Sequence, residues 1–133
     1  MVQPPDKFLQ HLFETGVDAV SAKICLPDHL PAPPPGRTIV VGAGKAAAAM
    51  AQILEVVWTG SLTGAVVVPY GHTANCKSID VVEAGHPVPD EAGQRATNHI
   101  LQLVSSLTSD DLVIALISGG GSSLLSLPAP GIA

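Results

Sequence analysis

Two glycine-rich turns, each directly after an apolar run, carry the residues of this chain that are best suited to chemistry. The first is Gly42-Ala43-Gly44-Lys45, which follows Thr38–Val41. The second is Ser118-Gly119-Gly120-Gly121-Ser122-Ser123, which follows Leu112–Ile117. Glycine tolerates positive φ and lets the backbone approach a ligand closely, so successive N–H groups can converge on phosphate oxygens. The sequence therefore predicts an anion-binding site.

Backbone amides of both turns and serine hydroxyls of the second turn are the expected contacts to phosphate. Three glycines in a row lose much backbone entropy on ordering, which favours a binding role over a merely structural turn. A helix beginning at Leu124 would add its dipole. A serine nucleophile is disfavoured, because the motif G-x-S-x-G is absent. The candidate phosphate-binding residues are Gly42, Gly44, Ser118, Gly119, Gly120, Gly121, Ser122 and Ser123.

The first turn formally fits the dinucleotide-binding motif G-x-G-x-x-[G/A] between a strand and a helix. A nicotinamide site also needs an Asp or Glu at the end of the second strand, and here that strand ends Val68-Pro69-Tyr70 without an acid. Lys45 is either a solvated surface charge or a ligand contact. An ammonium group at such a turn can neutralise a carboxylate or a transferring phosphoryl group, so Lys45 is the candidate catalytic residue.

His86 lies in Gly85–Asp90, directly after the third expected strand. Two roles stay open for it, a structural one beside Pro87 and a contact with a ligand at the same sheet edge. His, Asp and Glu residues show no metal-ligand spacing, so we expect no metal site in the chain. Any Mg²⁺ would arrive with a nucleotide.

The elements that must position these residues follow from hydrophobic periodicity. Asp6 to about Lys23 predicts an amphipathic helix, N-capped by Asp6 and packed on a sheet. Pro27–Gly36 holds five prolines and predicts a connector without regular structure. Beyond it, short apolar strands alternate with helices. The expected strands are Thr38–Val41, Gly64–Pro69, Ser78–Glu83 and Leu112–Ile117, and the expected helices are Ala46–Trp58 and one from the N-cap Asp90 to about Leu107.

This alternation predicts an α/β fold, a Rossmann-like three-layer sandwich with a mostly parallel sheet. Ligands of such sheets bind beyond the carboxyl ends of the strands, where both glycine turns lie. The last residues, Pro128–Ala133, read as the start of a connection, so we expect the fold to be incomplete at its C-terminal end.

Composition excludes several function classes. The chain of 133 residues has the length of one domain, 47% hydrophobic and only 13% charged residues, and a mean hydropathy of +0.41. No apolar run reaches the roughly 18 residues of a membrane span. Six Lys and Arg, a net charge of −5 and four aromatic residues argue against nucleic-acid binding. Two cysteines and the absence of a secretory signal favour a reducing, cytoplasmic location.

Three segments together resemble the N-terminal part of the glycerate 2-kinase family, also called MOFRL or type II glycerate kinases. Some of its members carry the older name hydroxypyruvate reductase of tartrate utilisation. The segments occur in the family's order and cover most of the chain. They are Val40–Ala47, Glu83–Asp90 and Leu116–Leu125.

The resemblance implies an enzyme that phosphorylates D-glycerate to 2-phosphoglycerate with ATP and Mg²⁺. It also implies two α/β domains with the active site between them, of which residues 1–133 would be the N-terminal part of the large domain, with the C-terminal domain absent. Lys45 matches the family's active-site lysine, residues 118–123 its phosphate loop, and His86 a motif histidine. We expect the 133 residues alone to be inactive, and a homo-oligomer is compatible with the resemblance.

Two other functions stay open. One is an NAD(P)H-dependent hydroxypyruvate reductase, against which the missing acid near Tyr70 counts. The other is a module that binds a small anion without catalysis.

Overall fold

Four short strands rich in β-branched residues pair in parallel to form one sheet. The computed structural model describes residues 4–132, and its strands stand in the order β3-β2-β1-β4. All three pairings are parallel, as expected for strands that read as continuous apolar runs. The strands are β1 (Thr38–Ala43), β2 (Thr63–Pro69), β3 (Ile79–Ala84) and β4 (Leu112–Ile117).

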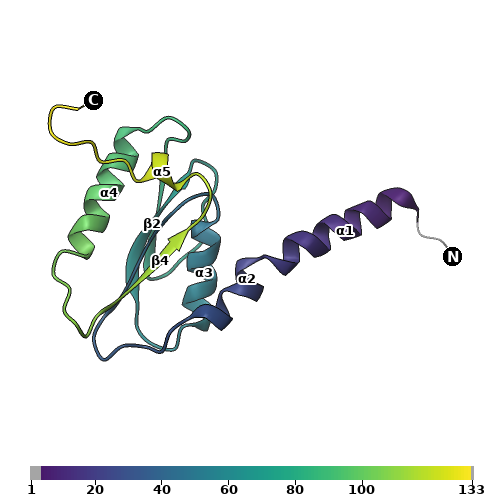
Figure 1. The fold of residues 1–133 in the computed structure, drawn as a ribbon, viewed down its shortest axis with the longest axis horizontal. Helices are drawn as coiled ribbons and strands as arrows, with labels where there is room; N and C mark the ends of the chain where they lie inside the picture. Colours follow the sequence, from purple (N-terminus) through teal and green to yellow (C-terminus); the bar gives the residue numbers. More distant parts are fainter. Residues whose placement is uncertain (1–3, 133) are drawn as a thin grey trace.

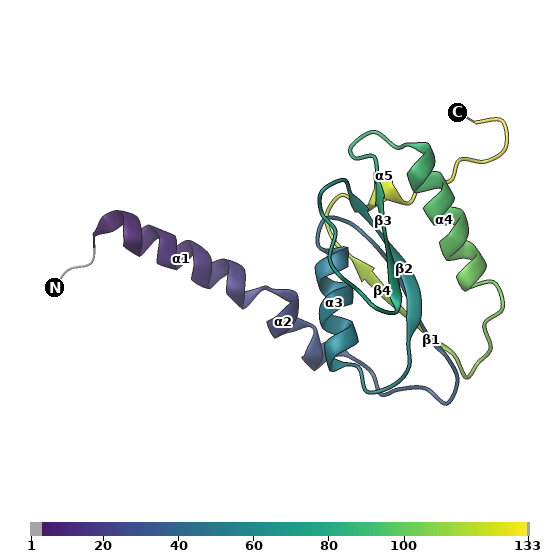
Figure 2. The same ribbon diagram turned by 180° about the vertical axis from the view of Figure 1, so that it is seen from behind.

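Helices cover both faces of this sheet (Figures 1 and 2). Helix α3 (Ala47–Val57) connects β1 to β2, and helix α4 (Glu91–Leu103) connects β3 to β4. The chain moves outward from β1 to β3 and then returns to the other side of β1. Because such crossovers are right-handed, the reversal puts α3 and α4 on opposite faces. The predicted α/β class with a parallel sheet is confirmed.

The core lies in two layers, one on each side of the sheet. On the α3 side, three alanines of the helix are buried, which lets the helix axis approach the strands closely; this layer contains Val40, Ala47, Ala48, Ala51, Leu54, Val66, Val68, Ile114 and Leu116. On the α4 side, small residues again line the sheet; this layer contains Ala43, Ala65, Val67, Ala84, Ala96, Ile100 and Leu124.

Helix α1 (Pro5–Ala19) projects away from the sheet (Figures 1 and 2), so the expectation that a helix over Asp6–Lys23 packs on the sheet is wrong. None of its residues is buried, and Pro4 rather than Asp6 precedes its first turn. A separate short helix, α2 (Ala22–Cys25), follows it and packs on α3. The 3.6-residue period identifies an apolar row, but it does not say which surface covers that row.

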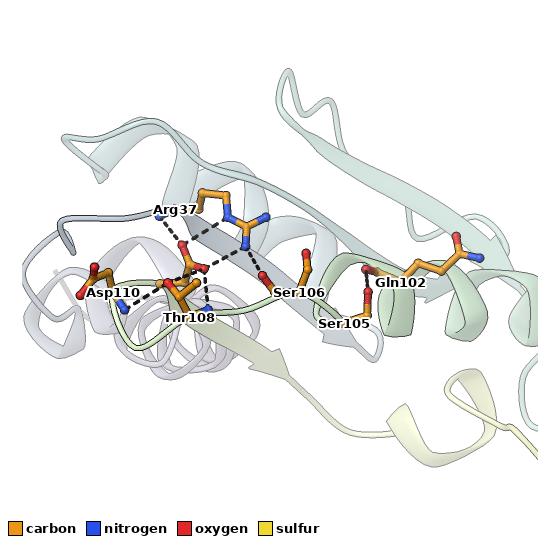
Figure 3. A network of polar contacts seen from close by, with 7 residues as sticks. Arg37, Gln102, Ser105, Ser106, Thr108 and Asp110 are labelled. Carbon is orange, nitrogen blue, oxygen red and sulfur yellow. Dashed lines mark hydrogen bonds and ion pairs between the residues drawn. The ribbon is translucent and has the colours of Figure 1, made fainter.

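The proline-rich connector contains one short 3₁₀ turn, η1 (Pro27–His29), although no regular structure was expected there. Helix α4 begins as predicted, with the side chain of Asp90 accepting from the Gly93 N–H at 3.0 Å. It ends at Leu103, short of the expected Leu107. The Ser105 hydroxyl donates to the Gln102 carbonyl at 2.8 Å (Figure 3), and such local side-chain bonds compete with further helix.

Two boundaries near the glycine turns differ from expectation. Strand β1 continues through Gly42 and Ala43, so the first turn begins at Gly44. The helix expected to begin at Leu124 instead ends there, because α5 is a single turn over Gly121–Leu124. The second turn therefore passes directly into α5.

A polar cluster joins the amino ends of β1 and β4, opposite to the glycine turns. The Asp111 carboxylate accepts from the Arg37 backbone N–H at 2.7 Å, from Arg37 Nη2 at 2.8 Å and from the Thr108 N–H at 2.9 Å. Arg37 Nη2 also donates to the Ser106 carbonyl at 2.7 Å (Figure 3). The hydrogen bonds from Arg37, with that from Thr108, hold the pKa of Asp111 well below its usual range.

Candidate functional site

The carboxyl ends of β1 and β4 are neighbours at the point where the strand order reverses. Ala43 pairs with Ile117 at this end of the ladder, so the turns that follow the two strands leave the sheet side by side. Strands on either side of such a point send their connections to opposite faces, and the crevice between them is where open α/β sheets bind ligands. The sequence placed both glycine turns at this edge, and the structure brings them together.

Hydrogen bonds fix the first turn against the second. The Gly44 N–H donates to the Val67 carbonyl at 3.0 Å, the Lys45 N–H to the Gly119 carbonyl at 3.4 Å, and the Ala46 N–H to Ser118 Oγ at 2.9 Å. The amides of the first turn are therefore used within the protein. Ser118 accepts a bond from the first turn, a contact that the sequence pattern did not reveal.

Gly42 and Gly44 are required where β4 and its turn come closest. A Cβ at Gly42 would overlap the Leu116 carbonyl oxygen of the neighbouring strand, and one at Gly44 would overlap Ser118. Gly44 also has a φ of +122°, a conformation that side chains other than glycine rarely adopt. These glycines let the two turns touch. That they also contact phosphate directly stays a prediction.

The second turn keeps its amides free. Within residues 4–132, no hydrogen-bond acceptor serves the backbone N–H of any residue from Gly119 to Ser123. Gly120 has a φ of +87°, and a Cβ at Gly119 would meet nothing within 4 Å. We call residues 118–123 the glycine loop. Consecutive free N–H groups around a left-handed glycine are the kind of backbone that binds anions.

Side chains add a cation and hydroxyls to this edge. Lys45 is exposed, and its amino group makes no hydrogen bond or ion pair within the part of the chain that the structure describes. The Ser123 hydroxyl makes only a long bond of 3.4 Å to the Gly120 carbonyl, and Ser122 is exposed. The ammonium and both hydroxyls are therefore available to a ligand.

His86 reaches the glycine loop from the other edge of the sheet. It is half-buried, and a Cβ built on Gly120 would lie 2.5 Å from its Nε2. Sequence reasoning could place the histidine at the carboxyl edge but not against this glycine, because β3 and β4 are not neighbours.

Asp90 and Tyr70 support the turn that carries His86, and Tyr70 was not predicted in this role. The Tyr70 hydroxyl donates to Asp90 Oδ2 at 2.8 Å. Backbone hydrogen bonds from Gly93 and Gly85, together with that hydroxyl, lower the pKa of Asp90. The same bond to Asp90 raises the pKa of Tyr70. At the end of β3, Glu83 accepts from the Gly71 N–H at 2.6 Å, so the carboxylates at this edge are already bonded within the protein.

An apolar groove with a volume of about 480 Å³ adjoins the first turn. Ala46, directly before α3, and Met50 within α3 form one wall, and residues of α1 and α2 with the segment after them form the other. It offers hydrophobic contact beside Lys45.

Residues 4–132 contain no group of three or more His, Cys, Asp and Glu side chains placed to hold a metal ion. Over the same residues, none of the helices has both the length and the apolar character needed to cross a bilayer.

Residues 8–133 match the model of the protein family described as "domain of unknown function (DUF4147)". A D-glycerate 2-kinase from Thermotoga maritima is 38% identical over 128 residues, which are 95% of this chain and 31% of the relative. A protein of Agrobacterium vitis, named as a presumed hydroxypyruvate reductase, is 48% identical over 121 residues, 90% of this chain and 28% of the relative.

Among solved structures, the crystal structure of a glycerate kinase from Thermotoga maritima matches with a TM-score of 0.83 and 36% identity. The match covers 96% of this chain and 31% of that one. This chain thus spans only about three tenths of the length of the relatives it matches. The likeness extends over nearly all of the fold described above, both glycine turns included.

Proposed function

The chain belongs to the family described as domain of unknown function (DUF4147), and on that premise we propose that it forms the phosphate-binding part of an ATP-dependent D-glycerate 2-kinase. In this reaction the 2-hydroxyl oxygen of D-glycerate attacks the γ-phosphorus of ATP. The bond from that phosphorus to the β–γ bridging oxygen breaks, ADP leaves, and the hydroxyl proton passes to a base. We assign that base to none of the described residues.

The observation that carries this proposal is the run of free amides in the glycine loop. The N–H groups from Gly119 to Ser123 have no acceptor within residues 4–132, and the loop lies at the reversal of the strand order, beside Lys45. Phosphoryl transfer needs positioning and charge stabilisation more than covalent chemistry from the protein. Amides and serine hydroxyls that hold the phosphate oxygens provide that positioning.

Lys45 is the residue that we propose for transition-state stabilisation. Its free ammonium group can neutralise the transferring phosphoryl group or the carboxylate of D-glycerate. Glu83 at the end of β3 and Asp90 in the turn after it both accept hydrogen bonds from backbone amides. We therefore propose that Mg²⁺ enters with the phosphates of ATP, whose charge it neutralises when bound.

The reductase alternative fits the first turn less well. A dinucleotide would place its pyrophosphate on the amides that follow β1, yet those of Gly44, Lys45 and Ala46 donate to protein acceptors. The end of β2 carries Tyr70 where a nicotinamide site would have an acid. A non-catalytic anion-binding module would use the same free amides as the kinase, so only turnover separates these two.

The test compares both reactions on the natural gene product that contains these residues. It is supplied with D-glycerate and Mg·ATP, and ADP release and the ³¹P spectrum of the product are recorded. A parallel assay uses hydroxypyruvate and NADH. We expect ADP and 2-phosphoglycerate in equal amounts. NADH oxidation without ADP release would favour the reductase, and nucleotide binding without turnover in either assay would favour the binding module.

A further inference from the structure

The imidazole of His86 packs directly on the left-handed glycine of the loop. A Cβ added to Gly120 would lie 2.5 Å from Nε2, 3.1 Å from Cδ2 and 3.4 Å from Cε1 of that ring. Three ring atoms therefore face one backbone position. Two independent constraints, the φ of +87° and the imidazole, exclude a side chain at Gly120.

This contact joins opposite edges of the sheet. His86 follows β3 and the glycine loop follows β4, which are three strand spacings apart in the order β3-β2-β1-β4, or roughly 14 Å. Helix α5 packs on β1 and β2, so the loop leaves the β4 edge and returns across the carboxyl ends of the middle strands. His86 meets it at the far end of this path.

Below the loop, the main chain of β1 supplies the other support. A Cβ at Gly121 would lie 3.3 Å from the Ala43 carbonyl oxygen, and the Ser118 N–H donates to that same oxygen at 3.0 Å. Gly119, in contrast, has open space around it. The loop is thus held by Ala43 at Gly121 and by His86 at Gly120, while the position between Ser118 and Gly120 faces outward.

The ring of His86 makes no hydrogen bond within residues 4–132. Its support of Gly120 is therefore steric, and it depends on the volume of the ring rather than on a particular nitrogen. The turn that carries the ring is anchored at its end, since Asp90 accepts from Gly93 and from Tyr70.

We propose that His86 is a positioning residue that holds the free amides of the glycine loop in the conformation that binds anions. The proposal rests on the proposed function of the loop as a phosphate site. His86 acts through Gly120, and its own nitrogens need not touch the ligand.

The first test is a titration of the 133-residue chain with inorganic phosphate and with Mg·ATP, followed through the backbone amide signals of residues 119–124 by NMR. We expect His86→Ala to weaken binding on the order of tenfold, which is about 1.4 kcal/mol. His86→Leu, which keeps most of the volume, should stay within about threefold of the wild type. His72→Ala, at an exposed histidine of the same sheet edge, is the matched control and should change nothing.

Two results would overturn the positioning role. Equal losses for His86→Leu and His86→Ala would mean that a ring nitrogen contacts the ligand directly. Unchanged affinity in both variants would mean that the loop holds its shape without His86.

A double-mutant cycle tests the contact without any ligand. Gly120→Ala should lower the melting temperature more in the wild type than in the His86→Ala background, because only the wild type adds the overlap with the ring to the strain at positive φ. Additive shifts would refute the contact. If the wild type binds neither phosphate nor ATP while the two substitutions are coupled, the proposed function fails and the structural role of His86 stands.

Discussion

Lys45 and the glycine loop meet at one edge of the sheet, where contacts within the protein hold the loop but not the Lys45 side chain. The Lys45 main chain is held by its bond to the Gly119 carbonyl, while its side chain is exposed and has no partner within residues 4–132. A charged side chain without a structural partner contributes little to folding. Its removal should therefore lower activity and leave stability almost unchanged.

We expect Lys45→Ala to reduce turnover of the natural gene product on the order of 100-fold, the loss typical of a group that stabilises transition-state charge. The melting temperature should change by less than about 3 °C, since an exposed substitution away from the core costs little. Steady-state kinetics with Mg·ATP and D-glycerate, together with thermal unfolding, measure both effects.

Lys77→Ala is the matched control for this substitution. Lys77 is an exposed lysine at the amino end of β3, away from the glycine loop, so its variant should retain wild-type turnover. Equal losses of turnover in the two variants would show that removal of any positive charge from the chain reduces activity, and the specific role of Lys45 would be wrong.

At the residue scale, the sequence identified candidates but not their contacts. Glycine after an apolar run predicts a turn, and Asp90 before an amphipathic stretch predicts a cap, because both signals are local. The bond from Ala46 to Ser118 and the packing of His86 on Gly120 join positions far apart in the chain. Such contacts depend on the strand order, which no local pattern specifies.

At the scale of helices and strands, the sequence likewise predicts what local residues determine and not what depends on distant residues. Runs such as Val66–Val68 are buried on both sides and predicted their strand correctly. The row of Leu9, Phe13 and Val17 predicted a helix correctly and its packing wrongly, because an apolar face gives no information about its partner. Helix α4 ended before Leu107 because a side-chain bond at Ser105 competes with the helix.

The cluster around Asp111 holds β1 and β4 together at their amino ends, and its substitution tests how the site's two strands are joined. We expect Asp111→Asn to lower the melting temperature at pH 7, because an amide nitrogen would face donors from Arg37 or Thr108. Asp110→Asn is the control, since the neighbouring carboxylate accepts no hydrogen bond within the described residues.

The same cluster gives a pH dependence with a definite sign. The folded pKa of Asp111 is depressed by Arg37 and Thr108, whereas the unfolded value is about 3.9. The stabilisation is therefore complete above the unfolded pKa and is lost as the pH falls toward the folded one. The difference in melting temperature between wild type and Asp111→Asn should be constant from about pH 7 to 5 and shrink below about pH 4; a constant difference at low pH would contradict this.

At the scale of the whole molecule, two apolar surfaces have no cover within the described residues. Helix α1 buries none of its residues, and Phe13 is 72% exposed. Strand β4 lies at the sheet edge. Its residues Val113 and Ile117 are exposed on the face of the sheet that carries α4, because α4 packs mainly on β2 and β3. Contiguous exposed apolar surface marks an interaction site, and a free strand edge offers unpaired backbone groups.

We expect a polypeptide like the remaining two thirds of the matched relatives to cover both surfaces, because the match covers only about a third of each of these longer chains. The test adds the corresponding part of the Thermotoga maritima D-glycerate 2-kinase to the 133-residue chain and measures amide hydrogen exchange. Exchange should slow in α1 and β4 and stay unchanged in α3.

Phe13→Asp should weaken association, whereas Gln10→Asp, a change from one polar residue to another on the same helix, should not. Protection of α1 and β4 by a second copy of the chain alone, at the same concentration, would instead identify these surfaces as a self-association interface, because burial of the same apolar area would then need no foreign segment.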